Sequence, residues 1–234
     1  MTVSFKKSTL REYFESIVIA VILALFVRTW AFQAFKIPTG SMEQNLLIGD
    51  HLLVNKFMFG PTATGLERRL LPVADITRGD VVVFKYPEEP ERDFIKRVIG
   101  LPGETLEVRR KRVYINGQRI DEPYVFHLQP PSDEASPHES GAFDLREQYG
   151  PVVIPPDSYF MMGDNRDNSQ DSRYWGFLPR SYVKGKALMV YWSFESERED
   201  YRETGLVATL GRLASVVVHF FTRTRWERLL HQIH

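Results

Sequence analysis

Asp80-Val81-Val82-Val83-Phe84-Lys85-Tyr86-Pro87 and Phe94-Ile95-Lys96-Arg97-Val98-Ile99 decide the fold class of this chain. Both are short runs rich in β-branched and aromatic residues, and a proline closes the first, as is typical of strands. Similar runs, separated by turn-forming residues, lie on either side, so we expect a mainly β fold. The predicted strands are 50–55, 80–86, 94–99, 105–108, 112–115, 152–154, 159–162 and 186–192, with a hairpin turn at Asn116-Gly117.

An apolar segment precedes the predicted β domain. Ser16 to Val27 carry no charge, and extension to 13–32 gives the roughly 20 residues that a membrane-spanning helix needs. Basic residues precede this segment, so the positive-inside rule places residues 1–12 in the cytoplasm. A core helix of a soluble protein and a cleaved secretory signal peptide are the alternatives. Glu12 and Glu15 are unusual in a signal peptide, and no clean A-x-A site follows, so we favour an uncleaved anchor.

The tail is apolar from Leu206 to Phe221, interrupted by Arg212. A second spanning helix is one interpretation, but a charge in the middle of a bilayer is costly. We favour a docked or membrane-interfacial segment.

The composition excludes several classes of function. Lysine and arginine together number 30, as do aspartate and glutamate, so no basic excess points to a nucleic acid partner. The chain has no cysteine, which excludes a disulfide framework, a thiolate metal site and a cysteine nucleophile. With 234 residues the chain is long enough to bury a core.

Ser41 and Lys96 stand in segments that suggest chemistry as well as packing. Ser41 follows Pro38-Thr39-Gly40, and a serine hydroxyl is a poor nucleophile unless a base takes its proton. Strand alternation places Lys96 on the same face as Phe94 and Val98, and apolar surroundings favour the neutral amine that such a base needs. Each residue also has an ordinary interpretation when it is taken alone. Ser41 would belong to a linker that follows the anchor, and Lys96 would be a lysine at the edge of a strand.

The segment from Met162 to Gly176 is dense in turn formers and carboxylates. It does not fit a calcium-binding EF-hand loop, because Arg166 occupies the third position counted from Asp164. We interpret the segment as a structural turn that supplies hydrogen bonds to a neighbouring site.

Two other interpretations are disfavoured. Arg78-Gly79-Asp80 suggests an adhesion motif, but a buried strand follows directly. A histidine base would need one of six histidines, none of which lies in a recognisable motif. They are His51, His127, His138, His219, His231 and His234.

Four segments, in this order and after an apolar segment, resemble those of the bacterial type I signal peptidases. They are 41–50, 78–87, 95–103 and 163–173. The resemblance implies a serine endopeptidase with a signal-peptidase-like β-rich catalytic domain after one transmembrane helix. It implies cleavage of signal peptides from secretory preproteins after small residues (A-x-A), without a metal or organic cofactor. The alternatives are another Ser/Lys protease of the self-cleaving type and an inactive relative that binds signal peptides.

The resemblance also implies a location and a domain organisation. The protein would be a single-pass protein of the bacterial inner membrane, in contact with the lipid bilayer and near the secretion translocon. Its expected parts are a cytoplasmic amino terminus (1–12), a transmembrane anchor (13–32), a catalytic domain outside the cytoplasm (33–195) with a β-rich insertion near 105–150, and a tail (196–234).

The resemblance implies a role for each matching residue. Ser41 would be the nucleophile and Lys96 the general base, with the Ser41 amide and the Thr39 hydroxyl as the oxyanion hole. Ser169 would orient the lysine amine. An ion pair between Asp171 and Arg173 would support the site, and shallow apolar substrate pockets would come from Ile37, Met42, Leu46 and Ile95.

Gln44-Asn45 departs from the family pattern, which usually has Pro-Thr there. These positions follow the nucleophile, so we expect them to shape its turn.

Overall fold

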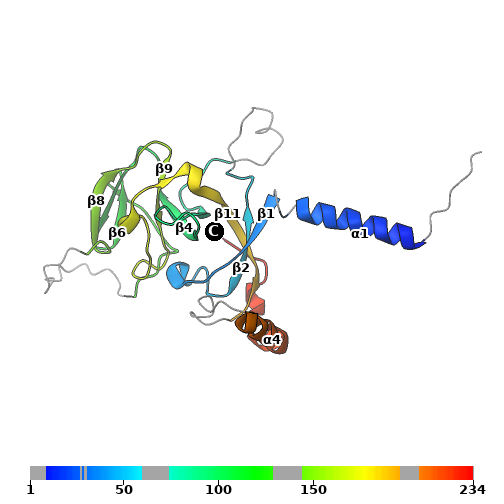
Figure 1. Ribbon diagram of the computed structural model, residues 1–234. Coiled ribbons are helices and arrows are strands. Elements are labelled where there is room, and N and C mark those ends of the chain that lie inside the picture. Colours follow the sequence, from blue (N-terminus) through cyan, green and yellow to red (C-terminus); the bar gives the residue numbers. More distant parts are fainter. Residues whose placement is uncertain are drawn as a thin grey trace, which may run out of the picture.

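Two antiparallel sheets form the body of the protein (Figure 1). The computed structural model describes residues 9–26, 28, 31–59, 74–128, 144–195 and 206–233. The larger sheet has the strand order β1-β2-β11-β3-β4-β9-β10, with β12 paired to β11. Its strands are β1 (Phe32–Lys36), β2 (Asp50–Asn55), β3 (Val81–Lys85), β4 (Asp93–Gly100), β9 (Ser158–Met162), β10 (Leu178–Pro179), β11 (Val183–Ser193) and β12 (His231–Gln232).

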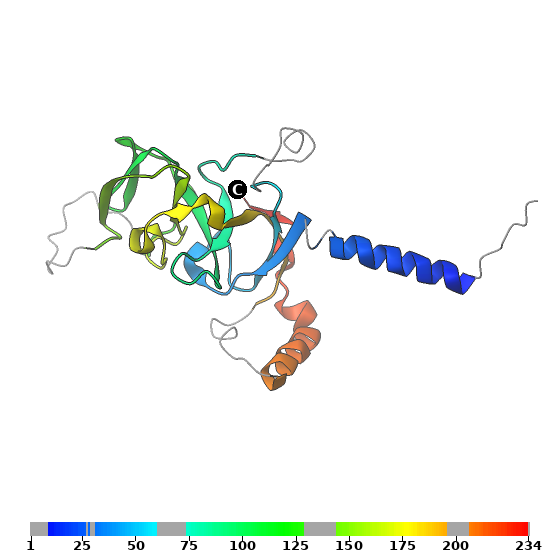
Figure 2. The ribbon, with the colours of Figure 1, turned by 45° about the horizontal axis from the view of Figure 1, so that its top comes forward.

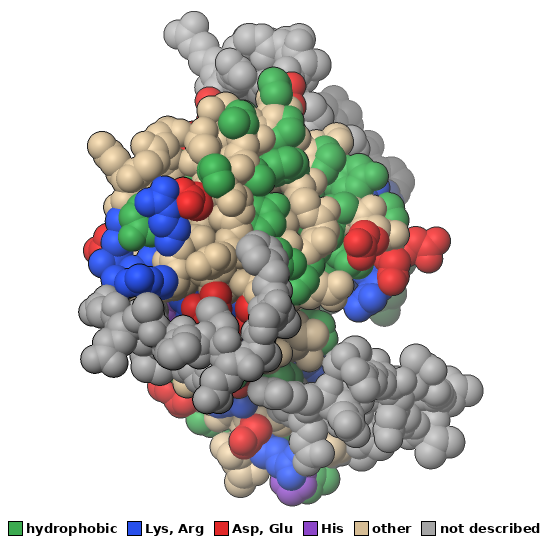
Figure 3. All heavy atoms as spheres, turned by 90° about the vertical axis from the view of Figure 1, so that its left-hand side faces the viewer, with side chains coloured by type: hydrophobic (Ala, Val, Ile, Leu, Met, Phe, Trp, Pro, Cys, Tyr) green, Lys and Arg blue, Asp and Glu red, His purple; other side chains and the backbone are tan. Residues whose placement is uncertain are grey.

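The smaller sheet has the order β7-β6-β5-β8. Its strands are β5 (Thr105–Arg109), β6 (Arg112–Ile115), β7 (Gln118–Arg119) and β8 (Gln148–Val153). Asn116 and Gly117 have φ angles of 51° and 80°, the left-handed conformation that a tight hairpin turn requires, and this confirms the predicted hairpin. Figure 3 looks onto the end of the molecule that carries β6 and β8, where hydrophobic and charged side chains are mixed.

β3 and β4 lie at the centre of the larger sheet, and their side chains are buried on both faces. Val81 to Phe84 are buried without alternation, as are residues 95–100 of β4. The two strands are in register, with Val82 opposite Lys96. The lysine therefore lies inside the body, with a core cluster on either side of the sheet. The mainly β prediction is confirmed.

The described amino-terminal helix has other bounds than the predicted 13–32 span. α1 covers Thr9–Phe26, and the backbone of Phe32 pairs with Asn55 as the first residue of β1. The helix therefore does not reach Phe32, because sheet pairing takes over there. None of the helices in the described ranges combines the length and apolar character that crossing a bilayer requires. α1 has no buried residue and projects away from the body (Figures 1 and 2).

The tail has two parts with different surroundings. α4 (Leu206–Arg223) ends in a turn where Val217, Val218 and Phe221 are exposed, and His219 interrupts its helical geometry. The residues that follow pack on the larger sheet through the short η4 helix (Trp226–Arg228) and β12. Residues 129–143, which belong to the β-rich insertion predicted near 105–150, lie outside the described residues.

Candidate active site

The structure brings Ser41 and Lys96 together from positions 55 residues apart. Ser41 lies in the short η2 helix (Gly40–Met42) between β1 and β2, and Lys96 lies in the middle of β4. Lys96 Nζ donates a hydrogen bond to Ser41 Oγ at 2.6 Å and another to the Ile95 carbonyl at 3.1 Å. Lys96 is 4% exposed and Ser41 7% exposed. The two side chains therefore form a buried, hydrogen-bonded pair.

The surroundings of Lys96 make its neutral form more accessible than that of an exposed lysine. Burial lowers the pKa of Lys96 to about 8, and the positive charge of Arg173 acts in the same direction, whereas Asp171 and Asp164 act against it. The Lys96 amine lies 5.3 Å from the centre of the Phe94 ring, as strand alternation predicted. A neutral amine in hydrogen-bonding contact with a serine hydroxyl can accept its proton, which is the geometry of a nucleophile and its base.

Backbone hydrogen bonds hold the segment that carries Ser41. We call residues 37–50 the serine loop. Its two ends pair through Ile37 N to the Asp50 carbonyl at 2.8 Å. Asn165 holds the middle, because its backbone N–H donates to the Ser41 carbonyl at 3.1 Å and its side chain to the Gly40 carbonyl at 3.2 Å. A Cβ at Gly163 would lie 2.5 Å from the Ser41 carbonyl oxygen, so this close approach requires glycine.

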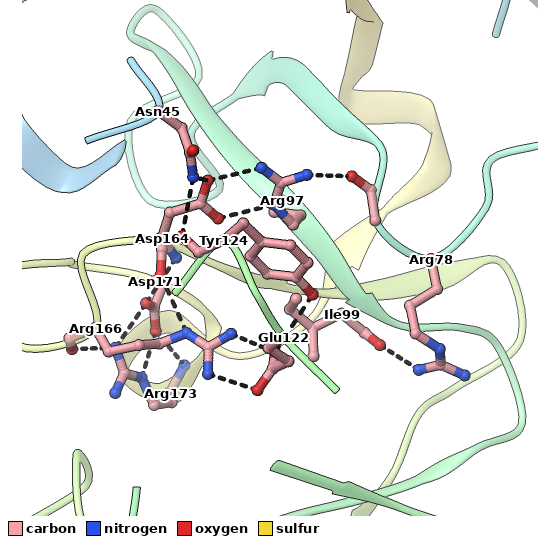
Figure 4. A network of polar contacts seen from close by, with 12 residues as sticks. Asn45, Arg78, Arg97, Ile99, Glu122, Tyr124, Asp164, Arg166, Asp171 and Arg173 are labelled. Carbon is pink, nitrogen blue, oxygen red and sulfur yellow. Dashed lines mark hydrogen bonds and ion pairs between the residues drawn. The ribbon is translucent and has the colours of Figure 1, made fainter. Parts of the chain in front are cut away.

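Figure 4 shows a network of buried ion pairs that includes Asp171–Arg173 and Arg97–Asp164. Arg173 and Asp171, the predicted pair, make two hydrogen bonds of 2.8 Å each. Burial alone would raise the pKa of Asp171, but the hydrogen bonds and charge of Arg173 outweigh it and hold that pKa below its ordinary value. The Asp171 carboxylate also accepts the Gly163 N–H at 3.1 Å, which ties this pair to the segment behind Ser41.

A second buried pair was not predicted. Arg97 binds both carboxylate oxygens of Asp164 at 2.8 and 2.7 Å, and both side chains are 1% exposed. Arg97 directly follows Lys96, so the two side chains point to opposite faces of β4. Arg166 and Glu122 form a further pair. The sequence signals were an arginine inside the apolar 94–99 run and an arginine among the carboxylates of 162–176. Nothing local to those segments identifies the acidic partners.

Ser169 occupies a different position from the one predicted. It is buried and packs close to Gly163, and its Oγ makes no hydrogen bond to the Lys96 amine. The Ser169 hydroxyl instead faces the Asp171 carboxylate, whose pKa it helps to lower. The amine instead contacts Ser41 Oγ and the Ile95 carbonyl.

A cavity of about 450 Å³ opens beside the pair. Of the residues predicted to contact substrate, only Ile95 lines the cavity. Ile37, Met42 and Leu46 belong to the serine loop, and they are buried in the core. Thr39 also lines the cavity, next to Ser41. The full lining is Pro38, Thr39, Gly40, Ser41, Arg92, Asp93, Phe94, Ile95, Lys96, Asn168 and Gln170.

The described histidines contact other parts of the molecule. His51 stacks on Trp192 with ring centres 4.8 Å apart, and His127 Nδ1 lies 3.9 Å from an Asp167 carboxylate oxygen. Ser41 has no hydrogen bond to a histidine within the described ranges, and no group of acidic and histidine side chains there could hold a metal ion. His138 and His234 lie outside these ranges.

Comparison with known proteins identifies the family. The family described as signal peptidase, peptidase S26, matches residues 10–192. Signal peptidase I of Pseudomonas aeruginosa is 37% identical over 212 residues, which cover 81% of this chain and 75% of the relative. Signal peptidase I P of Bacillus subtilis subsp. natto is 38% identical over 194 residues, 82% of this chain and 95% of the relative. The chain therefore belongs to the signal peptidase family of serine endopeptidases, peptidase S26.

Proposed function

We propose that this protein removes signal peptides from secretory preproteins by cutting after small residues (A-x-A), with Ser41 as the nucleophile and Lys96 as the general base. The observation that carries the proposal is the buried contact of 2.6 Å between Lys96 Nζ and Ser41 Oγ. Membership of the signal peptidase family supplies the substrate class.

The chemistry follows from the protonation state of Lys96. The neutral amine takes the Ser41 proton while Oγ attacks the scissile carbonyl, and the resulting ammonium then protonates the departing amine. The acyl-enzyme is released by a water molecule, which loses its proton to the same amine. The Ser41 N–H and the Thr39 hydroxyl stabilise the oxyanion of each tetrahedral intermediate.

The supporting residues hold this arrangement. The Asp171–Arg173 pair fixes the segment behind the serine loop. Ser169 fills the space beside Gly163, and its hydroxyl orients the amine by accepting a hydrogen bond from an amine N–H. Ile95 contacts the small substrate side chains. Ile37, Met42 and Leu46 set the depth of the pocket from within the core.

We also propose that the amino-terminal segment, of which α1 is the described part, anchors the protein in the bacterial inner membrane. Ile17, Ile19 and Ile22 each expose more than half of their surface, which favours a lipid environment over water. The body then lies outside the cytoplasm, close to the bilayer and the secretion translocon. There it meets signal peptides at high effective concentration.

The test is cleavage of a purified preprotein by the full chain in detergent. Wild type is compared with Ser41→Ala, Lys96→Ala and the control Lys85→Ala, which changes an exposed lysine at the end of β3. We expect cleavage at the A-x-A site by wild type and by the control, and loss of cleavage in the two site variants. Cleavage that survives Lys96→Ala would contradict the assignment of the base. Shortening of the enzyme itself without preprotein cleavage would favour a self-cleaving protease.

A further inference from the structure

The residues that follow α4 reach back to the serine loop. We call residues 224–233 the C-terminal arm. β12 pairs with β11, with His231 opposite Val190, and an isolated bridge joins Thr224 to Phe194. Figures 1 and 2 both place this segment, at the red end of the colour bar, beside the larger sheet. The arm is therefore fixed to β11, which pairs with β2. The serine loop ends at Asp50, the first residue of β2.

Arg228 of the arm binds the serine loop at two points. Its Nη2 donates to an Asp50 carboxylate oxygen at 2.7 Å and to the Asn45 carbonyl at 2.8 Å, while Nε donates to the other Asp50 oxygen at 3.2 Å. The Arg228 side chain is 13% exposed and that of Asp50 is fully buried. Arg225 adds a contact of 3.0 Å to the Ile48 carbonyl. The planar guanidinium suits this set of oxygens, because it presents several donors in one plane.

The contacts of Arg228 continue into the site. Asp50 also accepts the Leu47 N–H at 2.8 Å and so closes the turn before β2. The Asn45 side chain donates to Asp164 at 2.7 Å and to the Tyr124 carbonyl at 2.9 Å (Figure 4). Asn45 is thus held from both sides, by Arg228 at its carbonyl and by Asp164 at its amide. This residue belongs to the Gln44-Asn45 pair that stands where the family usually has Pro-Thr.

We propose that Arg228 is a positioning residue that keeps the serine loop in the register in which Ser41 meets Lys96. The inference rests on the proposed function of Ser41. Removing the guanidinium would leave the buried Asp50 carboxylate without its cation and the Asn45 carbonyl without that donor. The loop then rearranges to reach water or other donors, and Ser41 four residues upstream shifts relative to Lys96.

The experiment measures preprotein cleavage by the full chain carrying Arg228→Ala or Arg228→Lys. Arg223→Ala is the matched control, because it removes the same charge from an exposed residue at the end of α4, just before the arm. Active sites are counted with an acylating inhibitor that labels the nucleophile, and kcat and KM are expressed per labelled site. Because misplacement of reacting groups by about 1 Å can cost about 100-fold, we expect Arg228→Ala to lower kcat per site by about 10- to 100-fold with little change in KM.

Arg228→Lys keeps a charge beside Asp50 but does not provide the fork of donors, so we expect a smaller loss of kcat per site. Arg223→Ala should match wild type. If Arg228→Ala does not fold, the lysine variant gives the same test. Unchanged kcat per labelled site in whichever variant folds would overturn the inference and leave only a structural role for the arm. Preprotein cleavage that survives Ser41→Ala would instead overturn the proposed function, so the two failures are distinguishable.

Discussion

The pH dependence of cleavage tests the role of Lys96 most directly. Burial lowers its pKa from 10.5 to about 8, which corresponds to roughly 3 kcal/mol of destabilisation of the ammonium form. At pH 7 about one amine in ten is then neutral, against about one in 3,000 at the ordinary value. The depressed pKa therefore increases the fraction of active base at neutral pH by about 300-fold.

The assay is kcat/KM for a preprotein measured from about pH 6 to about pH 10 with chemistry rate-limiting. We expect the rate to rise about tenfold per pH unit below pH 8 and to level off above it, because the folded free enzyme loses the Lys96 proton near its pKa of about 8. The Lys85→Ala control should give the same midpoint. A flat profile over this range would refute the reasoning, and a midpoint near pH 6.5 would return the histidines to consideration.

Three further outcomes are expected. Lys96→Met removes a buried amine and should raise the free energy of unfolding in urea at pH 7 by up to roughly 3 kcal/mol. The gain should shrink between about pH 8 and pH 10.5, because the folded amine is already neutral there while the unfolded one still holds its proton; a constant gain would contradict the depressed pKa. Asp164→Asn breaks the buried pair with Arg97 and should cost about 3–5 kcal/mol in the same assay, whereas a loss below about 1 kcal/mol would show that the pair contributes little. Gly163→Ala places a Cβ 2.5 Å from the Ser41 carbonyl oxygen and should lower cleavage per labelled site about tenfold or more; wild-type cleavage would show that the loop accommodates the methyl group.

The strands were predictable because their signals are local. Val81 to Phe84 combine β-branched residues with burial on both faces, and Asn116-Gly117 can adopt left-handed angles at little cost. β1 was not predicted, because its apolar residues follow an apolar helix without a clear break and its strand character depends on pairing with β2. β12 has two residues, so only its partner β11 makes it a strand.

The candidate site was predictable in its residues but less so in its contacts. The apolar neighbours of Lys96 follow from strand alternation, whereas its approach to Ser41 depends on a sheet that brings together positions 55 apart. Family resemblance supplied that link. It could not supply the Arg97–Asp164 pair or the contacts of Asn45, because those partners lie 67 or more residues apart and no local pattern connects them.

The position of β11 has a consequence for when the protein becomes active. This strand lies between β2, which follows the serine loop, and β3, which pairs with the strand of Lys96. The strands that flank Ser41 and the strand that carries Lys96 therefore belong to one continuous sheet only after β11 has inserted between β2 and β3. β11 lies more than 80 residues further along the chain than β4. Such non-local pairing is slow to form, because the closure entropy of the long loop opposes it. A chain that is still folding therefore lacks an assembled nucleophile and base, and on the proposed function it cannot cut its neighbours before its own fold is complete.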